Sequence, residues 1–144
     1  MQVTDQEEAA LRAMLAGRFE EHQRLLGALE SSAERTGYTA LVSAAFAVAA
    51  SERFPDGTPA AEVVEYVGDV EARGESAGRI DLPVAERLIL AAIADEKTDD
   101  IDSQVSFDNQ LVLLVALAGD IPLDDAGRSA LLSKARKLAD SRLP

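Results

Sequence analysis

The sequence predicts an all-α protein, built as a compact bundle of about six helices with two apolar helices at its centre. Alanine, which has the highest helix propensity, is abundant, whereas aromatic residues make up only 4% of the chain. Apolar residues recur at helical spacing in several segments, and no segment alternates as a strand does. The 144 residues are most simply one domain, 1–144, with enough chain to bury a core.

The first expected helix begins at a capping box, with Thr4 as the N-cap and Glu7 three residues later. Its apolar stripe consists of Leu11, Met14, Leu15, Phe19, Leu25, Leu26 and Leu29. Counting about 100° per residue along one continuous helix places His22 near the centre of this stripe, with Arg18 close to the same line. A buried imidazole needs a hydrogen-bond partner, so we expect His22 to lie beside an acceptor from another helix.

Two further segments, at 38–54 and 106–118, are apolar on nearly all sides, which is typical of buried helices. Residues 31–37 break the helical pattern before the first of them. Gly119 lies directly after the second of these segments, and we expect it to adopt the left-handed conformation that often ends a helix and so to terminate the helix at 106–118. Because each of these helices needs neighbours on all sides, we place both at the centre of the bundle.

Three amphipathic helices are expected around this centre in addition to the first helix. Thr58 is the predicted cap of one, with Pro59 at its first position, where the missing N–H costs nothing. Asp81 and Asp124 are the predicted caps of the other two. The apolar faces contain Val63, Tyr66, Val67 and Val70, then Val84, Leu88, Ile89, Ala92 and Ile93, then Leu131, Leu132, Ala135, Leu138 and Ala139.

The composition limits the classes of partner. A net charge of −12 opposes binding to nucleic acid or to an anionic membrane surface, since both require clustered cations. The chain has no cysteine, which excludes disulfides, thiolate metal sites and cysteine nucleophiles. Its longest apolar run, 38–50, is shorter than the roughly 20 residues that span a membrane, and its acidic start is unlike a signal peptide. We therefore expect a cytoplasmic protein without a cofactor.

One stretch, GESAG at 74–78, matches the G-x-S-x-G pattern of a catalytic serine. It resembles the nucleophile elbow of the carboxylesterase family of α/β-hydrolases, which would make Ser76 the nucleophile. That elbow requires a strand before the serine and a histidine later in the chain, whereas here a helix precedes Ser76 and the single histidine, His22, lies upstream. We interpret Ser76 as a residue of a surface loop and predict no catalytic residue.

Acidic residues follow apolar helices at two places, AIADEKTDDID (92–102) and ALAGDIPLDD (116–125). These stretches resemble the TerB (tellurite-resistance) family, whose members are small all-helical proteins with acidic, metal-associated loops in two similar halves. The resemblance implies four ligands for a divalent cation, namely Asp95, Asp99, Asp120 and Asp124. The chain departs from the family at Glu96 and Ile121, where a glycine is expected, and at 127–128, where an acidic residue is expected.

The acidic connector at 95–104 does not satisfy the EF-hand template, because its third, sixth and twelfth positions are Lys97, Asp100 and Ser106. A solvated acidic loop is the alternative interpretation. More broadly, the chain resembles small Ala-rich helical proteins of actinobacteria, and this resemblance implies no activity.

The sequence favours a small non-enzymatic module that binds a protein partner or a second copy of itself. The first helix is the predicted contact surface, around Arg18, Phe19 and His22, because polar groups interrupt its apolar stripe there. The alternative is a protein that binds divalent cations, or another small cationic ligand, through the acidic loops. An enzyme is the third possibility, since no acid, base and nucleophile stand out together.

Overall fold

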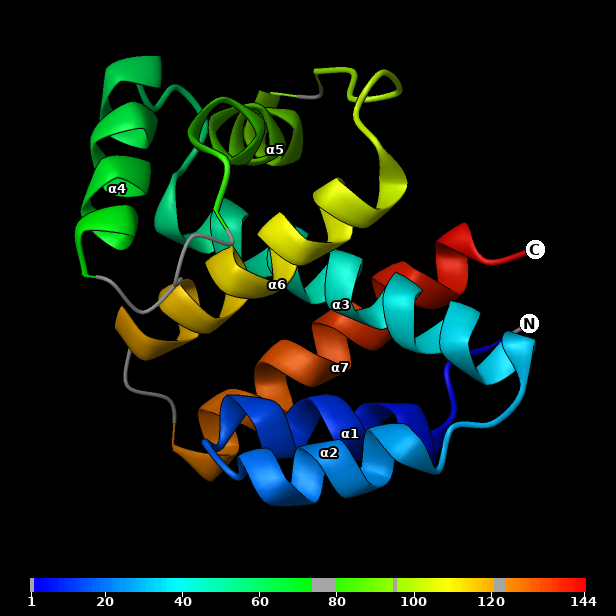
Figure 1. Cartoon of the computed structure of the whole chain (residues 1–144). Helices are drawn as coiled ribbons and strands as arrows, with labels where there is room; N and C mark the ends of the chain where they lie inside the picture. The colour runs from blue at the N-terminus through cyan, green and yellow to red at the C-terminus, as the bar shows by residue number, and fades with distance from the viewer. Residues whose placement is uncertain (1, 74–79, 95, 121–123) are drawn as a thin grey trace. The chain divides into compact units, whose positions relative to one another are not determined.

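The computed structural model describes residues 2–73, 80–94, 96–120 and 124–144 of the chain. All regular structure within these ranges is helical, which confirms the all-α prediction, and it forms seven helices instead of about six (Figure 1). Their bounds are α1 Asp5–Leu15, α2 Phe19–Gly27, α3 Ser32–Arg53, α4 Ala60–Ala72, α5 Leu82–Ala94, α6 Ser103–Asp120 and α7 Asp125–Arg142. None of the described helices is long and apolar enough to serve as a membrane span.

The contacts among the helices group the chain into two compact units. The first unit consists of residues 1–45 and 121–144, and it contains α1, α2, α7 and the first part of α3. The second unit, residues 46–120, contains the rest of α3 together with α4, α5 and α6. The first unit is thus assembled from both ends of the sequence.

The predicted capping box fixes the start of α1. The Thr4 N–H donates to Glu7 Oε1 at 3.2 Å, and the Glu7 N–H donates to Thr4 Oγ1 at 3.3 Å. Thr4 Oγ1 also lies 2.9 Å from Glu7 Oε2, and the Glu7 side chain is buried against Gly37 of α3. A Cβ atom on Gly37 would lie 2.7 Å from Glu7 Cδ, so only glycine lets α3 approach α1 this closely.

A turn at Gly17 divides the predicted first helix into α1 and α2, which lie side by side and antiparallel (Figure 1). Gly17 adopts a φ of 77°, a left-handed conformation that glycine reaches without strain. The Gly17 and Arg18 N–H groups donate to the carbonyls of Met14 and Ala13, which forms a Schellman motif. The prediction of one continuous helix is therefore wrong, because the chain reverses its direction at Gly17.

The second capping box of the first unit was not predicted. The Glu34 N–H donates to Ser31 Oγ at 3.1 Å, and the Ser31 N–H donates to Glu34 Oε1 at 3.4 Å. Of residues 31–37, which were predicted as a break, Ser31 precedes α3 and residues 32–37 form its first turns. The prediction of a buried helix here is confirmed, since no residue from Leu41 to Ala50 is exposed.

The chain segment before α1 is fastened to α7. The Val3 N–H donates to Asp140 Oδ1 at 2.7 Å, and the Val3 carbonyl accepts from Arg136 Nη2 at 2.8 Å. Arg136 Nη1 donates in addition to Asp5 Oδ1 at 2.8 Å. These bonds hold the beginning and the end of the described chain together within the first unit.

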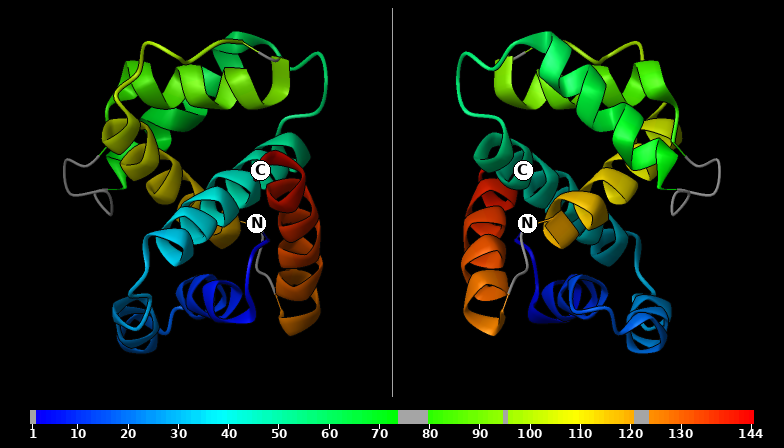
Figure 2. Two further views of the ribbon diagram at one scale, coloured as in Figure 1. Left: turned by 90° about the vertical axis from the view of Figure 1, so that its right-hand side faces the viewer. Right: turned by 90° about the vertical axis from the view of Figure 1, so that its left-hand side faces the viewer.

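In the second unit, α5 contacts both α4 and α6 (Figure 2). Asp81 caps α5 as predicted, because its Oδ1 accepts from the Val84 N–H at 3.2 Å. The Asp81 N–H donates to Oδ1 of the buried Asn109 at 2.8 Å, which ties the start of α5 to α6. In α6 the buried apolar residues are Leu113, Leu114, Ala116 and Leu117, whereas Val105 and Val115 are each 37% exposed, so this helix is not covered on all sides as predicted.

Two predicted helix ends in this unit are wrong. Pro59, not Thr58, is the N-cap of α4, and no side chain caps this helix. Thr58 Oγ1 instead donates to the Pro55 carbonyl at 2.6 Å and closes the preceding turn. Gly119 does not stop α6 in a left-handed conformation, because α6 continues through it to Asp120.

Candidate functional site

The structure separates the three residues that were predicted to form a contact surface. Arg18 is the N-cap of α2 and Phe19 is its first residue, and their exposed fractions are 71% for the Arg18 side chain and 58% for Phe19. His22 is buried instead, and its Nδ1 lies 2.9 Å from the Ala10 carbonyl of α1. Because a carbonyl only accepts, Nδ1 carries the proton in this bond. His22 thus has a hydrogen-bond acceptor as predicted, but this acceptor lies on α1, which was predicted to be part of the same helix as His22.

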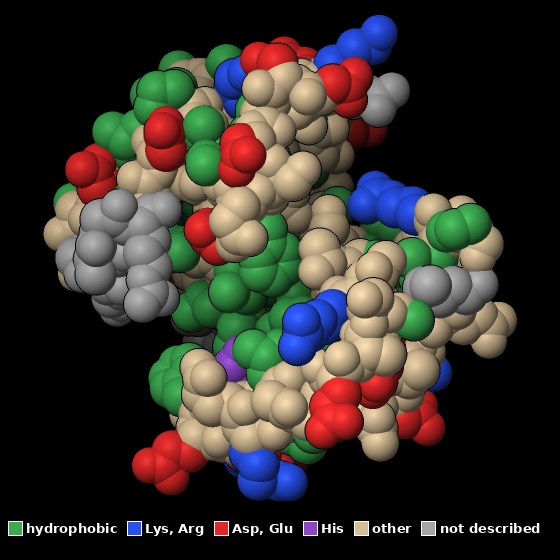
Figure 3. All heavy atoms as spheres, turned by 45° about the vertical axis from the view of Figure 1, so that its right-hand side comes forward, with side chains coloured by type: hydrophobic (Ala, Val, Ile, Leu, Met, Phe, Trp, Pro, Cys, Tyr) green, Lys and Arg blue, Asp and Glu red, His purple; other side chains and the backbone are tan. Residues whose placement is uncertain are grey.

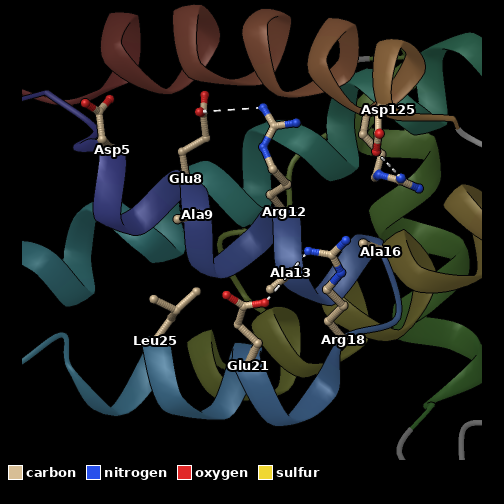
Figure 4. Close-up of a pocket in the computed structure, with 11 residues that line it drawn as sticks. Asp5, Glu8, Ala9, Arg12, Ala13, Ala16, Arg18, Glu21, Leu25 and Asp125 are labelled. Carbon is tan, nitrogen blue, oxygen red and sulfur yellow. Dashed lines mark hydrogen bonds and ion pairs between the residues drawn. The ribbon is translucent and has the colours of Figure 1, made fainter.

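Beside Arg18, the helices α1, α2 and α7 form a groove of about 210 Å³ (Figure 4). The floor is the face of α1 that carries Ala9, Ala13 and Ala16, which recur at helical spacing and leave the groove open. The other lining residues are Asp5, Glu8, Arg12, Arg18, Glu21, Leu25, Asp125 and Arg128. All of them belong to the first unit.

The charges of the groove are distributed unevenly along α1. Asp5 and Glu8 lie toward the start of this helix, whereas Arg12 lies near its end, on the side where Arg18 also extends (Figure 4). Arg136 of α7 approaches both carboxylates of the acidic end, at 2.8 Å from Asp5 Oδ1 and 3.8 Å from Glu8 Oε1. One guanidinium therefore offsets part of the negative charge of the two carboxylates.

At the basic end, two arginines make only long ion pairs. Arg12 Nη2 lies 3.8 Å from Glu8 Oε2, and Arg18 Nη1 lies 3.9 Å from Glu21 Oε2. These distances exceed those of charge-assisted hydrogen bonds. The short polar contact of Arg12 is with a neutral group, since its Nη1 donates to Ser129 Oγ at 3.0 Å. The positive charges of Arg12 and Arg18 are thus only loosely compensated.

The third arginine of the groove holds the carboxylate of Asp125. Arg128 Nη2 donates to Asp125 Oδ1 at 2.6 Å, and this hydrogen bond is the main reason that the pKa of Asp125 is lowered. The positive charge of Arg128 lowers the pKa of Asp125 further, whereas desolvation raises it by more than either Arg18 or Arg12 lowers it. Asp125 also begins α7, where the helix dipole favours an anion. Arg128 is therefore the arginine that binds Asp125, while Arg12 and Arg18 line the same end of the groove.

The described members of the predicted metal-ligand set fall in both units, Asp99 and Asp120 in the second and Asp124 in the first. Asp120 accepts from Tyr66 Oη and from Arg73 Nη1, each at 2.8 Å. Asp124 is the N-cap of α7, as predicted, and accepts from the Gly127 N–H at 2.7 Å. Asp99 is exposed in the second unit, and Asp95 lies outside the described residues.

Acidic side chains (red) lie at separate places on the face drawn in Figure 3. In the ranges that the structure describes, no group of three His, Asp or Glu side chains is arranged to hold a metal ion. Asp100 of the acidic connector receives two hydrogen bonds from the Arg87 guanidinium, at 2.7 and 2.9 Å. Divalent-cation binding through these loops remains a prediction. Ser76 also lies outside the described residues.

The partners of Asp120 define a polar cluster that the sequence did not indicate. Burial raises the pKa of Tyr66, and the hydrogen bond to Asp120 raises it further. The Arg53 guanidinium lies over the Tyr66 ring, 5.3 Å from its centroid, and over the Phe54 ring at 4.7 Å. These contacts join the end of α3, α4 and the end of α6, and we assign them a structural role.

The sequence predicted Arg18 as a site residue but did not predict the rest of the arginine group, Arg12 and Arg128. Arg12 follows Glu8 by four residues on α1, and Arg128 follows Asp125 by three on α7, which are ordinary spacings for surface ion pairs. Nothing local distinguishes them from other exposed arginines. Their convergence depends on the packing of α7 against α1.

No protein-family model matches the chain, and no curated protein or solved structure gives a significant match.

Proposed function

We propose that the protein is a non-enzymatic interaction module that binds a partner protein at the start of α2. The observation that carries this proposal is the exposure of Phe19, 58% of which is accessible in a chain with few aromatic residues. Large aromatic side chains are enriched at protein interfaces, where they bury much apolar area at low entropic cost. Arg18, also enriched at interfaces as a residue type, lies directly beside it.

The groove supports the same surface. It includes Arg18 at its rim and offers a concave face with both charged and apolar lining. His22, buried beneath, holds α2 against α1 through its bond to the Ala10 carbonyl, so the surface rests on a fixed hairpin. The acidic, cysteine-free composition favours the cytoplasm as the place of this interaction.

The test is quantitative affinity purification with the parent chain and with the Phe19→Ala variant, followed by mass spectrometry. The matched control is Val64→Ala, which removes an apolar side chain of similar exposure, 47%, from α4. We expect at least one protein to be captured by the parent and by the control, and to be lost with Phe19→Ala. Because Phe19 is exposed, its truncation should leave the melting temperature nearly unchanged. Capture that is equal for all three chains would refute the proposal.

A further inference from the structure

We infer that the basic end of the groove binds an acidic segment of the partner protein, and that Asp125 occupies the carboxylate position when the partner is absent. This inference rests on the proposed function and adds the chemistry of the partner. The three arginines involved are Arg12, Arg18 and Arg128.

The geometry supports a carboxylate as the bound group. Arginine presents a planar fork of N–H donors that matches a carboxylate, and Arg128 already binds the Asp125 carboxylate at 2.6 Å. Arg12 and Arg18 line the same end of the groove, and each lies at least 3.8 Å from its acidic neighbour. Both therefore have the capacity to bind a carboxylate supplied from outside.

Asp125 is suited to give way to an incoming carboxylate. Its side chain is 95% exposed, so Asp125 loses few contacts with the protein surface when it moves into water. An exchange of one carboxylate for another at Arg128 keeps this arginine paired in both states. An Asp or Glu residue of the partner protein thus gains the contacts that Asp125 releases.

An extended segment fits the groove better than a small anion does. The groove runs along α1 over the small side chains of Ala9, Ala13 and Ala16, which leave room for a peptide backbone. At the far end, Arg136 offsets part of the charge of Asp5 and Glu8, so we place the carboxylate of the bound segment at the basic end. Leu25 supplies an apolar contact on the α2 side.

The experiment begins with selection of peptides that bind the full chain from a random library displayed on phage. We expect the selected peptides to share at least one acidic residue. Affinity of the best peptide is then measured by fluorescence polarisation for variants of the chain. Arg12→Gln should weaken binding about ten-fold, the effect of losing one charge-assisted hydrogen bond. Asp125→Asn should tighten binding, by about two-fold or more, because it removes the competing carboxylate.

Two controls separate charge from structure. Lys137→Gln changes the net charge by the same amount as Arg12→Gln but lies outside the groove, so it should leave the affinity unchanged. Ser129→Ala removes the hydrogen bond between Arg12 and α7 while keeping the guanidinium, and it should also retain binding. Loss of binding with Ser129→Ala as well would show that Arg12 acts through the fold, which overturns the inference.

The remaining outcomes also decide the question. Selected peptides without acidic residues, an affinity that Arg12→Gln does not change, or weaker binding by Asp125→Asn would each overturn the inference. Displacement of the peptide by millimolar inorganic phosphate, but not by equal ionic strength of chloride, would identify a small-oxyanion site instead. The proposed function fails separately, since it depends on Phe19. Capture that is lost with Phe19→Ala but retained with Arg12→Gln would uphold the interaction surface and reject the acidic partner.

Discussion

Replacing Gly37 with alanine should destabilise the protein, although alanine is the better helix former. Gly37 lies inside α3, where the exchange alone would stabilise a helix by about 1 kcal/mol. The new Cβ atom, however, would lie 2.7 Å from Cδ and 2.9 Å from Oε2 of Glu7, so the carboxylate must move. Glu7 is buried and its carboxylate interacts with the N–H and hydroxyl of Thr4 at 3.2 and 2.9 Å.

The magnitude follows from these two contacts. A hydrogen bond to a charged group contributes about 1.5 kcal/mol at the lower end of its range, so losing both costs about 3 kcal/mol. After subtraction of the gain in helix propensity, Gly37→Ala should lower the free energy of unfolding by about 2 kcal/mol. The assay is urea denaturation followed by circular dichroism, which reports the loss of helix.

A matched control and a double variant make the prediction sharp. A Cβ atom on Gly68, in the interior of α4, would meet no atom within 4 Å, so Gly68→Ala should stabilise the chain by about 1 kcal/mol. In a Glu7→Ala background the obstacle is absent, and Gly37→Ala should then be stabilising by about the same amount. If Gly37→Ala stabilises the parent chain as much as Gly68→Ala does, the close approach of α1 and α3 is refuted.

Three further perturbations test other features. Gly17→Ala should lower the free energy of unfolding by about 1 kcal/mol in the same denaturation assay, because a φ of 77° is unfavourable for a residue with a Cβ atom, although the space around Gly17 is open. An unchanged free energy of unfolding would contradict the Schellman turn. Spectrophotometric titration should show both tyrosines ionising above the ordinary value of 10, since burial raises the pKa of Tyr38 to about 12 and raises that of Tyr66 as well. Because folding favours the protonated phenols, their contribution to the free energy of unfolding is complete below pH 10 and is lost as the pH rises toward 12. A tyrosine that ionises near pH 10 in the folded chain would disprove the burial of that tyrosine. Addition of calcium or magnesium should leave the melting temperature unchanged, because Asp120 and Asp124 already accept hydrogen bonds. A rise in the melting temperature that EDTA reverses would favour the TerB-like alternative.

The features predicted correctly from the sequence are those that depend on neighbouring residues. The capping pair Thr4 and Glu7, and the caps Asp81 and Asp124, act within a single helical turn, so residue type and spacing suffice to find them. The buried character of α3 also follows from its composition, because a helix apolar on nearly all sides is stable only when covered.

The division into α1 and α2 was missed for a definite reason. Hydrophobic periodicity detects apolar residues at helical spacing, and this spacing is compatible with one long helix or with two consecutive short helices. A glycine within a helical pattern is compatible with either structure, and only the left-handed φ decides between them. Phe19 was consequently assigned to a buried stripe, whereas α2 presents it to solvent.

The arginine group was beyond local reasoning for a different reason. Arg12 and Arg128 are separated by more than a hundred residues, and the tertiary contact between α1 and α7 brings them to one groove. His22 shows the intermediate case. The burial of His22 and its need for an acceptor were predicted from its position in the stripe. Only the three-dimensional structure identifies Nδ1 as the donor atom and the Ala10 carbonyl as the acceptor.

The attachment of Val3 to α7 has a consequence for biosynthesis. Residues 46–120 emerge from the ribosome between the two halves of the first unit, and at about 5–20 residues per second their synthesis takes roughly 4–15 s. During this interval the segment before α1 lacks its hydrogen bonds with Arg136 and Asp140. The second unit, which is contiguous, is able to fold while translation continues. We therefore expect the α1–α2 hairpin to mature last, after the ribosome has released α7.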